Sequence, residues 1–340
     1  AVNTGTGNVA LGVSALGATT TGSYNIALGT QALDSNVSGS HNIGIGFATV
    51  DGDTLGSKSI GIGGFALGTQ NFTTATDAHN VAVGYNTGAA VTTGVNNTLI
   101  GGLAGDAITD ADSNVAVGYG SLTTNVLGSR SVAVGQGSLS DQNPASATDM
   151  YNIAVGYNAG AAVTTGVKNT IIGGLAGDAL TTADENTLVG YVAGSSLTTG
   201  EDNVLIGSLT GDALTEGKDN VAVGRNSLSA DTKGRQSVAI GSSALSVQNF
   251  TTLTDTYNTA VGSSAGAAVT TGTDNTLIGG LCGDAITDGN KNTAMGSYAL
   301  TTNQRGDRNT AIGHEALKVM NPSGDVDVYN TALGYYSGGA

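Results

Sequence analysis

Acidic side chains recur at a fixed spacing along this chain, and the spacing could gather them into a cation site. Glu185, Asp202 and Asp219 are separated by 17 residues each. If 17 residues form one structural unit and units stack about 4.8 Å apart, as neighbouring strands do, the three carboxylates form a ladder. Ca²⁺ prefers clustered oxygen ligands, so one interpretation is a calcium site. The simpler alternative is a solvated acidic face, partly neutralised by Lys168 and Lys218.

A Gly-Asp-Ala tripeptide also recurs, with its aspartates at Asp106, Asp178, Asp212 and Asp284. Asp side chains commonly hold turns by bonding to nearby backbone groups, and this is the role we expect. Around a three-fold axis, the same carboxylates could instead form a ring that traps a cation.

The other reactive residues do not form a catalytic pattern. His41, His79 and His314 share no ligand spacing, and the single cysteine, Cys282, excludes an internal disulfide. A polysaccharide-degrading tailspike needs two carboxylates in a cleft, whereas most acids here fall at turn positions. We therefore predict no enzyme, and no cofactor other than possible calcium.

Paired threonines could in principle form an ice-binding rank. Their position shifts between the repeating units, however, so the rank is broken and we do not favour this function. The pairs are Thr92-Thr93, Thr164-Thr165, Thr198-Thr199 and Thr270-Thr271.

Charge and hydropathy restrict the partners. The net charge is −15, from 11 basic and 26 acidic residues, and such a polyanion repels nucleic acid and anionic lipid. The sequence contains no apolar run of about 18 residues, so we expect no membrane insertion of this segment.

A short repeat must position all of these residues. Its consensus is Asn-x-Ala-x-Gly, and we number each unit from the Asn as position 1. The nineteen units are 17 residues apart, except for four steps of 21. They start at residues 8, 25, 42, 59, 80, 97, 114, 131, 152, 169, 186, 203, 220, 237, 258, 275, 292, 309 and 330.

The repeat predicts an all-β chain, with one short strand at positions 2 to 4 of each unit. The Gly at position 5 marks a corner that needs positive φ or close backbone approach, and a second Gly at position 15 marks another corner. We expect the Asn at position 1 to form an axial hydrogen-bonded ladder. Representative corner residues are Asn8, Asn25, Asn203, Gly12, Gly29 and Gly207.

These features describe a single-stranded parallel β-solenoid of about 19 coils. In some coils the core is filled by Leu at position 9; in others position 9 is Gly and an aliphatic residue stands at position 12. Both faces of the strand are apolar, and such strands are covered on both sides. Because one coil has room for only one interior, the second face predicts association with copies of the same chain.

Four motifs carry a resemblance to a known family. Asn25-Ile-Ala-Leu-Gly29, Ser131-Val-Ala-Val-Gly135 and Ser237-Val-Ala-Ile-Gly241 resemble the head repeat of trimeric autotransporter adhesins, the YadA-like head. Asn309-Thr-Ala-Ile-Gly-His-Glu-Ala-Leu317 is similar to the version found in phage and prophage tail fibres. The resemblance implies a left-handed β-roll, a side-by-side homotrimer and a role in surface attachment, although the coils here are longer than those of adhesin heads.

We therefore expect residues 1–340 to form one continuous repeat array, as a segment of a longer fibre. The favoured function is a phage or phage-like tail fibre that attaches to a host surface, where a cell-surface glycan or protein could be the partner. The alternative is the head domain of a bacterial adhesin. Both place the chain outside the cell, on a virion or on a bacterial surface.

The four longer units contain inserted loops at about residues 68–79, 140–151, 246–257 and 318–329. We expect these loops to bulge outward, with Phe72 and Phe250 serving as staples to a neighbouring chain or as rings that stack on a ligand. Bracing of a trimer is the favoured alternative to ligand contact. The candidate contact residues are Phe72, Asp77, Asp149, Tyr151, Phe250, Tyr257 and Tyr329.

Overall fold

The computed structural model describes residues 4–322, 324 and 326–339. Its regular secondary structure consists of short parallel strands joined by turns. No helix occurs in these ranges, and therefore none that could cross a membrane. The chain is a parallel β-solenoid of about 19 coils spaced about 17 residues apart, as the repeat predicts. It divides into two compact units, Ala1–Lys168 and Asn169–Ala340.

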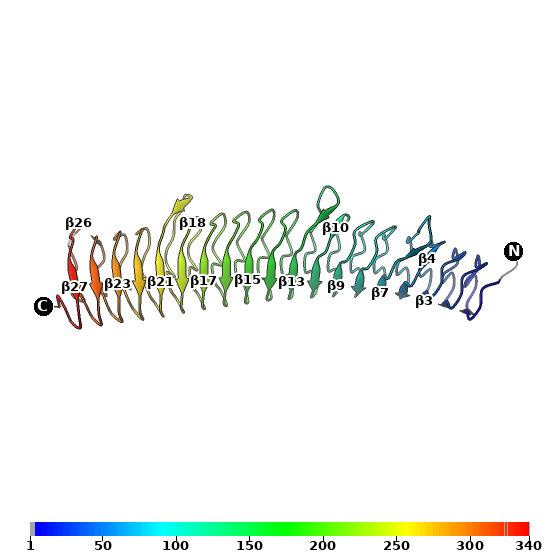
Figure 1. Ribbon diagram of the computed structural model, residues 1–340, viewed down its shortest axis with the longest axis horizontal. Helices are drawn as coiled ribbons and strands as arrows, with labels where there is room; N and C mark the ends of the chain where they lie inside the picture. The colour runs from blue at the N-terminus through cyan, green and yellow to red at the C-terminus, as the bar shows by residue number, and fades with distance from the viewer. Residues whose placement is uncertain (1–3, 323, 325, 340) are drawn as a thin grey trace. The chain divides into compact units, whose positions relative to one another are not determined.

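In the first unit, each coil contributes one three-residue strand, and the strands lie side by side in chain order (Figure 1). The pairing is parallel and keeps equivalent positions in register; Val9 pairs with Ile26, and Ala10 with Ala27. The strands are β1 (Val9–Leu11), β2 (Ile26–Leu28), β3 (Ile43–Ile45), β5 (Ile60–Ile62), β7 (Val81–Val83), β8 (Thr98–Ile100), β9 (Val115–Val117), β11 (Val132–Val134) and β13 (Ile153–Val155).

The second unit repeats this ladder. Thr187 pairs with Val204, and Leu188 with Leu205, again one coil apart. The strands are β14 (Thr170–Ile172), β15 (Thr187–Val189), β16 (Val204–Ile206), β17 (Val221–Val223), β19 (Val238–Ile240), β21 (Thr259–Val261), β22 (Thr276–Ile278), β23 (Thr293–Met295), β25 (Thr310–Ile312) and β27 (Thr331–Leu333).

Each inserted loop adds a two-residue strand that pairs with the coil before it. Figure 1 shows the segments at β10 and β18 projecting beyond their neighbouring coils. The pairs are β4 (Gly56–Ser57) with β6 (Thr76–Asp77), β10 (Gly128–Ser129) with β12 (Thr148–Asp149), β18 (Gly234–Arg235) with β20 (Thr254–Asp255), and β24 (Gly306–Asp307) with β26 (Val326–Asp327).

Side chains alternate across each strand. Apart from Ala10 in the first unit, position 3 is buried and points into the coil, as at Ala116 and Leu205, whereas positions 2 and 4 lie on the outer face. The interior is completed by Leu at position 9, as at Leu122, or by an aliphatic residue at position 12, as at Leu197, and both are fully buried. Either arrangement therefore fills the same thin core.

Backbone turns of the left-handed type close every coil. Gly207, at position 5, has φ 140°, a conformation open essentially to glycine alone. Positions 7 and 17 also have positive φ, near 60° at Leu103 and Glu185. The glycines at position 15 serve another purpose, because a Cβ on Gly289 would lie 2.9 Å from the carbonyl oxygen of Gly306 in the next coil.

Candidate functional site

The outer strand face, which we define as positions 2 and 4 of every coil, is an uncharged and mostly apolar surface. All residues at position 4 are aliphatic or Met, and position 2 holds only Val, Ile or Thr. Most are half-buried by their neighbours, but Leu11 and Leu333, in the first and last of the nineteen units, expose 72 % and 76 % of their surface. Six others at position 4 expose between 36 % and 41 %. These are Ile62, Ile100, Ile172, Ile206, Ile240 and Met295. Contiguous exposed apolar surface of this kind is typical of a contact site.

A ladder of buried asparagines holds each coil to the next. The backbone N–H of Asn203 donates to Oδ1 of Asn186 at 3.0 Å, and the N–H of Asn220 donates to Oδ1 of Asn203 at 3.1 Å. Nδ2 of Asn203 donates to the carbonyl oxygen of Gly217 at 2.9 Å. Asn25 is bonded to Asn8 in the same way, at 2.9 Å. The side chain thus supplies the hydrogen bonds that the corner removes from the strand ladder.

The inserted loops repair this ladder where the asparagine is missing. Ser59 stands at position 1 in the first long coil, and buried Gln70 bridges from it to the next asparagine. Nε2 of Gln70 donates to Oγ of Ser59 at 2.9 Å, and Nδ2 of Asn80 donates to Oε1 of Gln70 at 2.8 Å. Gln142 and Gln248 bridge the equivalent serines and asparagines in their own loops. Sequence reasoning missed this role of the three glutamines.

The fourth long coil follows the same logic with different residues. Asn309 is retained at position 1, and the loop carries Met320 where the other loops carry Gln. Oδ1 of Asn309 accepts directly from the backbone N–H of Asn330 at 3.3 Å. A longer side chain at position 1 therefore removes the need for the glutamine. The pairing of Ser with Gln, and of Asn with Met, is a signal that the sequence already contained.

The expected outward placement of Phe72 and Phe250 is wrong. Only 4 % and 7 % of these residues is exposed. A Cβ on Gly56 would lie 2.7 Å from Cδ2 of Phe72, so this ring occupies the space that the glycine of the previous coil leaves open. The loop roots thus belong to the interior of their own chain, and the exposed residues are the tips, such as 73–75 and 145–147.

The acidic and aromatic loop residues pair with cations of the preceding coil. Asp77 bonds Nζ of Lys58 at 2.6 Å, and Asp255 bonds Arg235 at 2.8 Å. Asp149 and Asp327 form ion pairs with Arg130 and Arg308. The same two arginines reach the hydroxyls of Tyr151, at 3.0 Å, and Tyr329, at 2.8 Å, whereas Tyr257 is half exposed. These contacts tie each loop to its own chain.

The proposed calcium ligands are not gathered into a site. Glu185, Asp202 and Asp219 occupy the exposed corner at position 17 of successive coils. Across the described ranges, no three His, Cys, Asp or Glu side chains form a group that could hold a metal ion.

The Gly-Asp-Ala aspartates and Cys282 are held within the chain by hydrogen bonding or by burial. Oδ1 of Asp106 accepts from the hydroxyl of Thr123 at 2.6 Å, and burial raises the pKa of the Asp284 carboxyl. Cys282 is fully buried at the small position 8, as expected, and burial raises the pKa of its thiol to about 12. His41 stacks on Tyr24, with ring centroids 5.2 Å apart.

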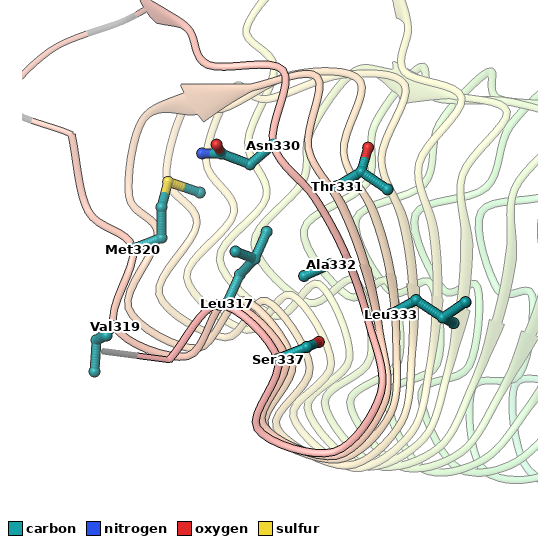
Figure 2. A pocket seen from close by; sticks show the side chains of 9 residues that line it. Leu317, Val319, Met320, Asn330, Thr331, Ala332, Leu333 and Ser337 are labelled. Carbon is teal, nitrogen blue, oxygen red and sulfur yellow. The ribbon is translucent and has the colours of Figure 1, made fainter.

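A depression of about 510 Å³ lies at the last coil of the second unit. In Figure 2, Leu317 and Ala332 point into the coil, whereas Thr331 and Leu333 point outward. The space therefore opens onto the interior of the solenoid, where the core residues Leu317 and Ala332 line it. We do not interpret it as a ligand site.

Buried aspartates predict that the chain resists unfolding better in mild acid than at neutral pH. Asp231 is fully buried, and desolvation raises the pKa of its carboxyl although Gln248 donates to it at 2.6 Å. Burial also raises the pKa of Asp178 and Asp212. A raised folded-state pKa adds stability below the unfolded value, near 3.8, and this stability is lost as pH rises through the folded value.

We expect denaturant unfolding at pH 4 to require more denaturant than unfolding at pH 7. In the Asp231→Asn variant, the increase in the denaturant midpoint from pH 7 to pH 4 should be smaller, because one of the contributing carboxyl groups no longer titrates. Asn fits this place, since Asn125 and Asn303 occupy it in equivalent coils. A stability that instead falls steadily from pH 7 to pH 4 would contradict the assignment.

No protein-family model matches the chain, and no curated protein matches it either.

Proposed function

We propose that the chain is a structural segment of a fibre, in which copies associate side by side as a homotrimer through the outer strand face. The observation that carries this proposal is the absence of charge at positions 2 and 4 of all nineteen coils, in a chain with net charge −15. A sheet face in contact with water usually carries polar and charged residues. Nineteen coils without one charged residue on this face indicate that it is covered.

A second copy of the chain is the occupant that fits best. The apolar surface repeats with every coil, so a partner must repeat at the same rise to cover it along each unit. Another copy does so in register, coil against coil. The charged residues stand at corners and loops, such as Asp202 and Glu216, so contact through the strand face keeps most acids of neighbouring copies apart.

The resemblance to tail-fibre and adhesin repeats supports the biological role. A rigid parallel array with braced loops suits a shaft that holds a binding end away from a particle. We infer a phage or phage-like tail fibre on the outside of the virion, in contact with a glycan or protein of the host surface, and no catalytic activity. The head of a bacterial trimeric adhesin is the second candidate, since the same motifs support it.

Introducing charge on the strand face is expected to dissociate the assembly. Aspartate at Ile172, Val189, Ile206 and Val223 places four carboxylates on adjacent coils of this face. Burying unpaired charges costs several kcal/mol each, so light scattering should give the mass of one chain, 33.2 kDa. Circular dichroism should still report β structure, because these side chains point away from the core.

The matched control adds the same charge to a different surface of the coils, at position 14. Thr165, Thr182, Thr199 and Thr271 are exposed at position 14, and changing all four to aspartate should leave the assembled mass unchanged. The proposal fails if the strand-face variant keeps the assembled mass, or if both variants dissociate alike.

A further inference from the structure

Exposed aromatic rings follow the position 5 corner on alternate coils of the first unit. Phe47, Tyr85, Tyr119 and Tyr157 stand at position 6 of the coils that start at residues 42, 80, 114 and 152. Between 47 % and 61 % of each residue is exposed. Coils rise about 4.8 Å, so successive rings lie about 9.6 Å apart along the unit. We call these four residues the aromatic rank.

Glycines make room for the rank. Gly64 and Gly102 occupy position 6 in two of the three intervening coils, and Gln136 occupies it in the third. A Cβ on Gly64 would lie 3.5 Å from Cδ2 of Tyr85, and one on Gly102 would lie 3.6 Å from Cδ2 of Tyr119. The rings of Tyr85 and Tyr119 therefore each lie against the glycine of the coil before them. From Phe47 to Tyr119, position 6 thus alternates between an aromatic residue and a glycine.

The rank is best formed beside a depression of about 380 Å³. Phe65 and Tyr85 line it, and their ring centroids are 6.1 Å apart in an edge-to-face arrangement. Phe47 continues the cluster, with its centroid 5.2 Å from that of Phe65. The depression is thus a concave site with aromatic walls, the usual form of a small-ligand site.

Three polar side chains also line the depression. Asp51 is half-buried, and burial, together with the nearby Asp34 carboxylate, raises the pKa of its carboxyl. In the described part of the chain, neither the Asp51 carboxylate nor the Asn86 side-chain amide makes a hydrogen bond. The hydroxyl of Thr69 donates to the carbonyl oxygen of Ala89 at 2.8 Å and can still accept. Unpaired acceptors and donors beside aromatic walls match a ligand with many hydroxyl groups.

We propose that the aromatic rank and the neighbouring Phe65 together bind an extended, uncharged polysaccharide, with sugar rings stacked on Tyr85 and Phe65 and hydroxyls bonded to Asp51 and Asn86. The flat C–H face of a sugar packs on an aromatic ring, whose face is electron-rich. Acidic polysaccharides are disfavoured by the net charge of −15 and by the Asp34 and Asp51 carboxylates.

The spacing extends the site along the unit. Two coil rises are close to the length of one disaccharide in an extended β-linked chain, so alternate coils meet equivalent sugars. Several weak subsites on one ligand then act together. This surface is separate from the outer strand face, because the depression is lined by positions 6, 7, 10 and 11 and by no residue of positions 2 or 4. The inference therefore does not rest on the proposed assembly.

Calorimetric titration of the whole chain tests the proposal. The probes are β-1,4-linked hexasaccharides of glucose, mannose and N-acetylglucosamine, the disaccharides of the same sugars, and hexagalacturonate as a charged probe. We expect at least one neutral hexasaccharide to bind more tightly than its disaccharide and than hexagalacturonate. Tyr85→Ala and Phe65→Ala should each weaken this binding about tenfold, the scale of one lost aromatic contact.

The matched control is Tyr24→Ala, which removes a tyrosine with 59 % exposure from the corner at position 17; its affinity should equal that of the unmodified chain. Light scattering on the same samples separates binding from assembly. Weakened binding with unchanged mass supports the proposal. The proposal is overturned if no neutral hexasaccharide binds the unmodified chain, or if Tyr85→Ala binds with normal affinity. It is also overturned if the Tyr85→Ala variant loses assembled mass together with affinity.

Discussion

Replacing Gly207 with alanine is expected to lower the free energy of unfolding by about 3 kcal/mol or more, because two penalties coincide. The residue has φ 140°, which side chains rarely adopt. The new Cβ would also lie 2.6 Å from the carbonyl oxygen of Gly224 and 2.7 Å from Oγ1 of Thr210. The coil cannot relax alone, since its neighbours are stacked at one strand spacing. Thermal and denaturant unfolding at matched chain concentration measure the loss.

Gly120→Ala is the control for this change. Gly120 also has positive φ, at 62°, but a Cβ there meets nothing within 4 Å. Leu103 and Leu175 hold the equivalent position in other coils, with φ of 59° and 57°. The expected loss is about 1 kcal/mol. Equal losses at Gly120 and Gly207 would show that close stacking at position 5 is unimportant.

Replacing Asn203 with leucine should have the next largest effect. Leucine has a similar size, but it removes the acceptor for the N–H of Asn220 and the donor to the carbonyl oxygen of Gly217. These groups are buried, and each unsatisfied group costs about 1–3 kcal/mol. We therefore expect a loss of about 3 kcal/mol, seen as a lower unfolding midpoint in circular dichroism.

Asn158→Leu separates the ladder from a general cost of losing asparagine. Asn158 stands at position 7, where its side chain makes no hydrogen bond with the described part of the chain and where Leu103 and Leu175 occur naturally. Its replacement should leave the midpoint nearly unchanged. A midpoint for Asn203→Leu as high as that for Asn158→Leu would contradict the ladder.

The fold could be predicted from the sequence because the same residue types recur at the same positions of many units. Strands at positions 2 to 4 follow from the alternation at Val115 and Val117 around Ala116. The corner at Gly207 and the ladder at Asn203 follow from residue types that recur at one position. Register needed no separate argument, because equivalent positions stack.

The conformation of the inserted loops was harder to predict, because each loop interrupts the repeat at a single place and its residues do not recur in every coil. The outward bulge suggested an exposed Phe72, but the ring turns inward to fill the space over Gly56. The burial of Gln70 depends on Ser59 being too short to reach Asn80, which is a relation between three residues of two coils. Single positions did not reveal it, whereas comparison of the four loops would have done so.

The aromatic rank was also present in the sequence but not recognised. Tyr85 and Tyr119 stand two coils apart, each preceded by a glycine at the same position one coil earlier. Their exposure, and the depression beside Phe65, become visible only when the coils are stacked. The proposed calcium ligands Glu185 and Asp202 share a column and occupy exposed corners of successive coils; calcium binding there stays a prediction.

Solution mass is the most direct test of the central claim, that the outer strand face is covered by copies of the same chain. Multi-angle light scattering of the unmodified chain should give three times 33.2 kDa, and this value should persist on dilution and at high salt, since the contact is apolar. A stable, fully folded species of 33.2 kDa would contradict the account, because the uncharged face of every coil would then stand in water without a partner.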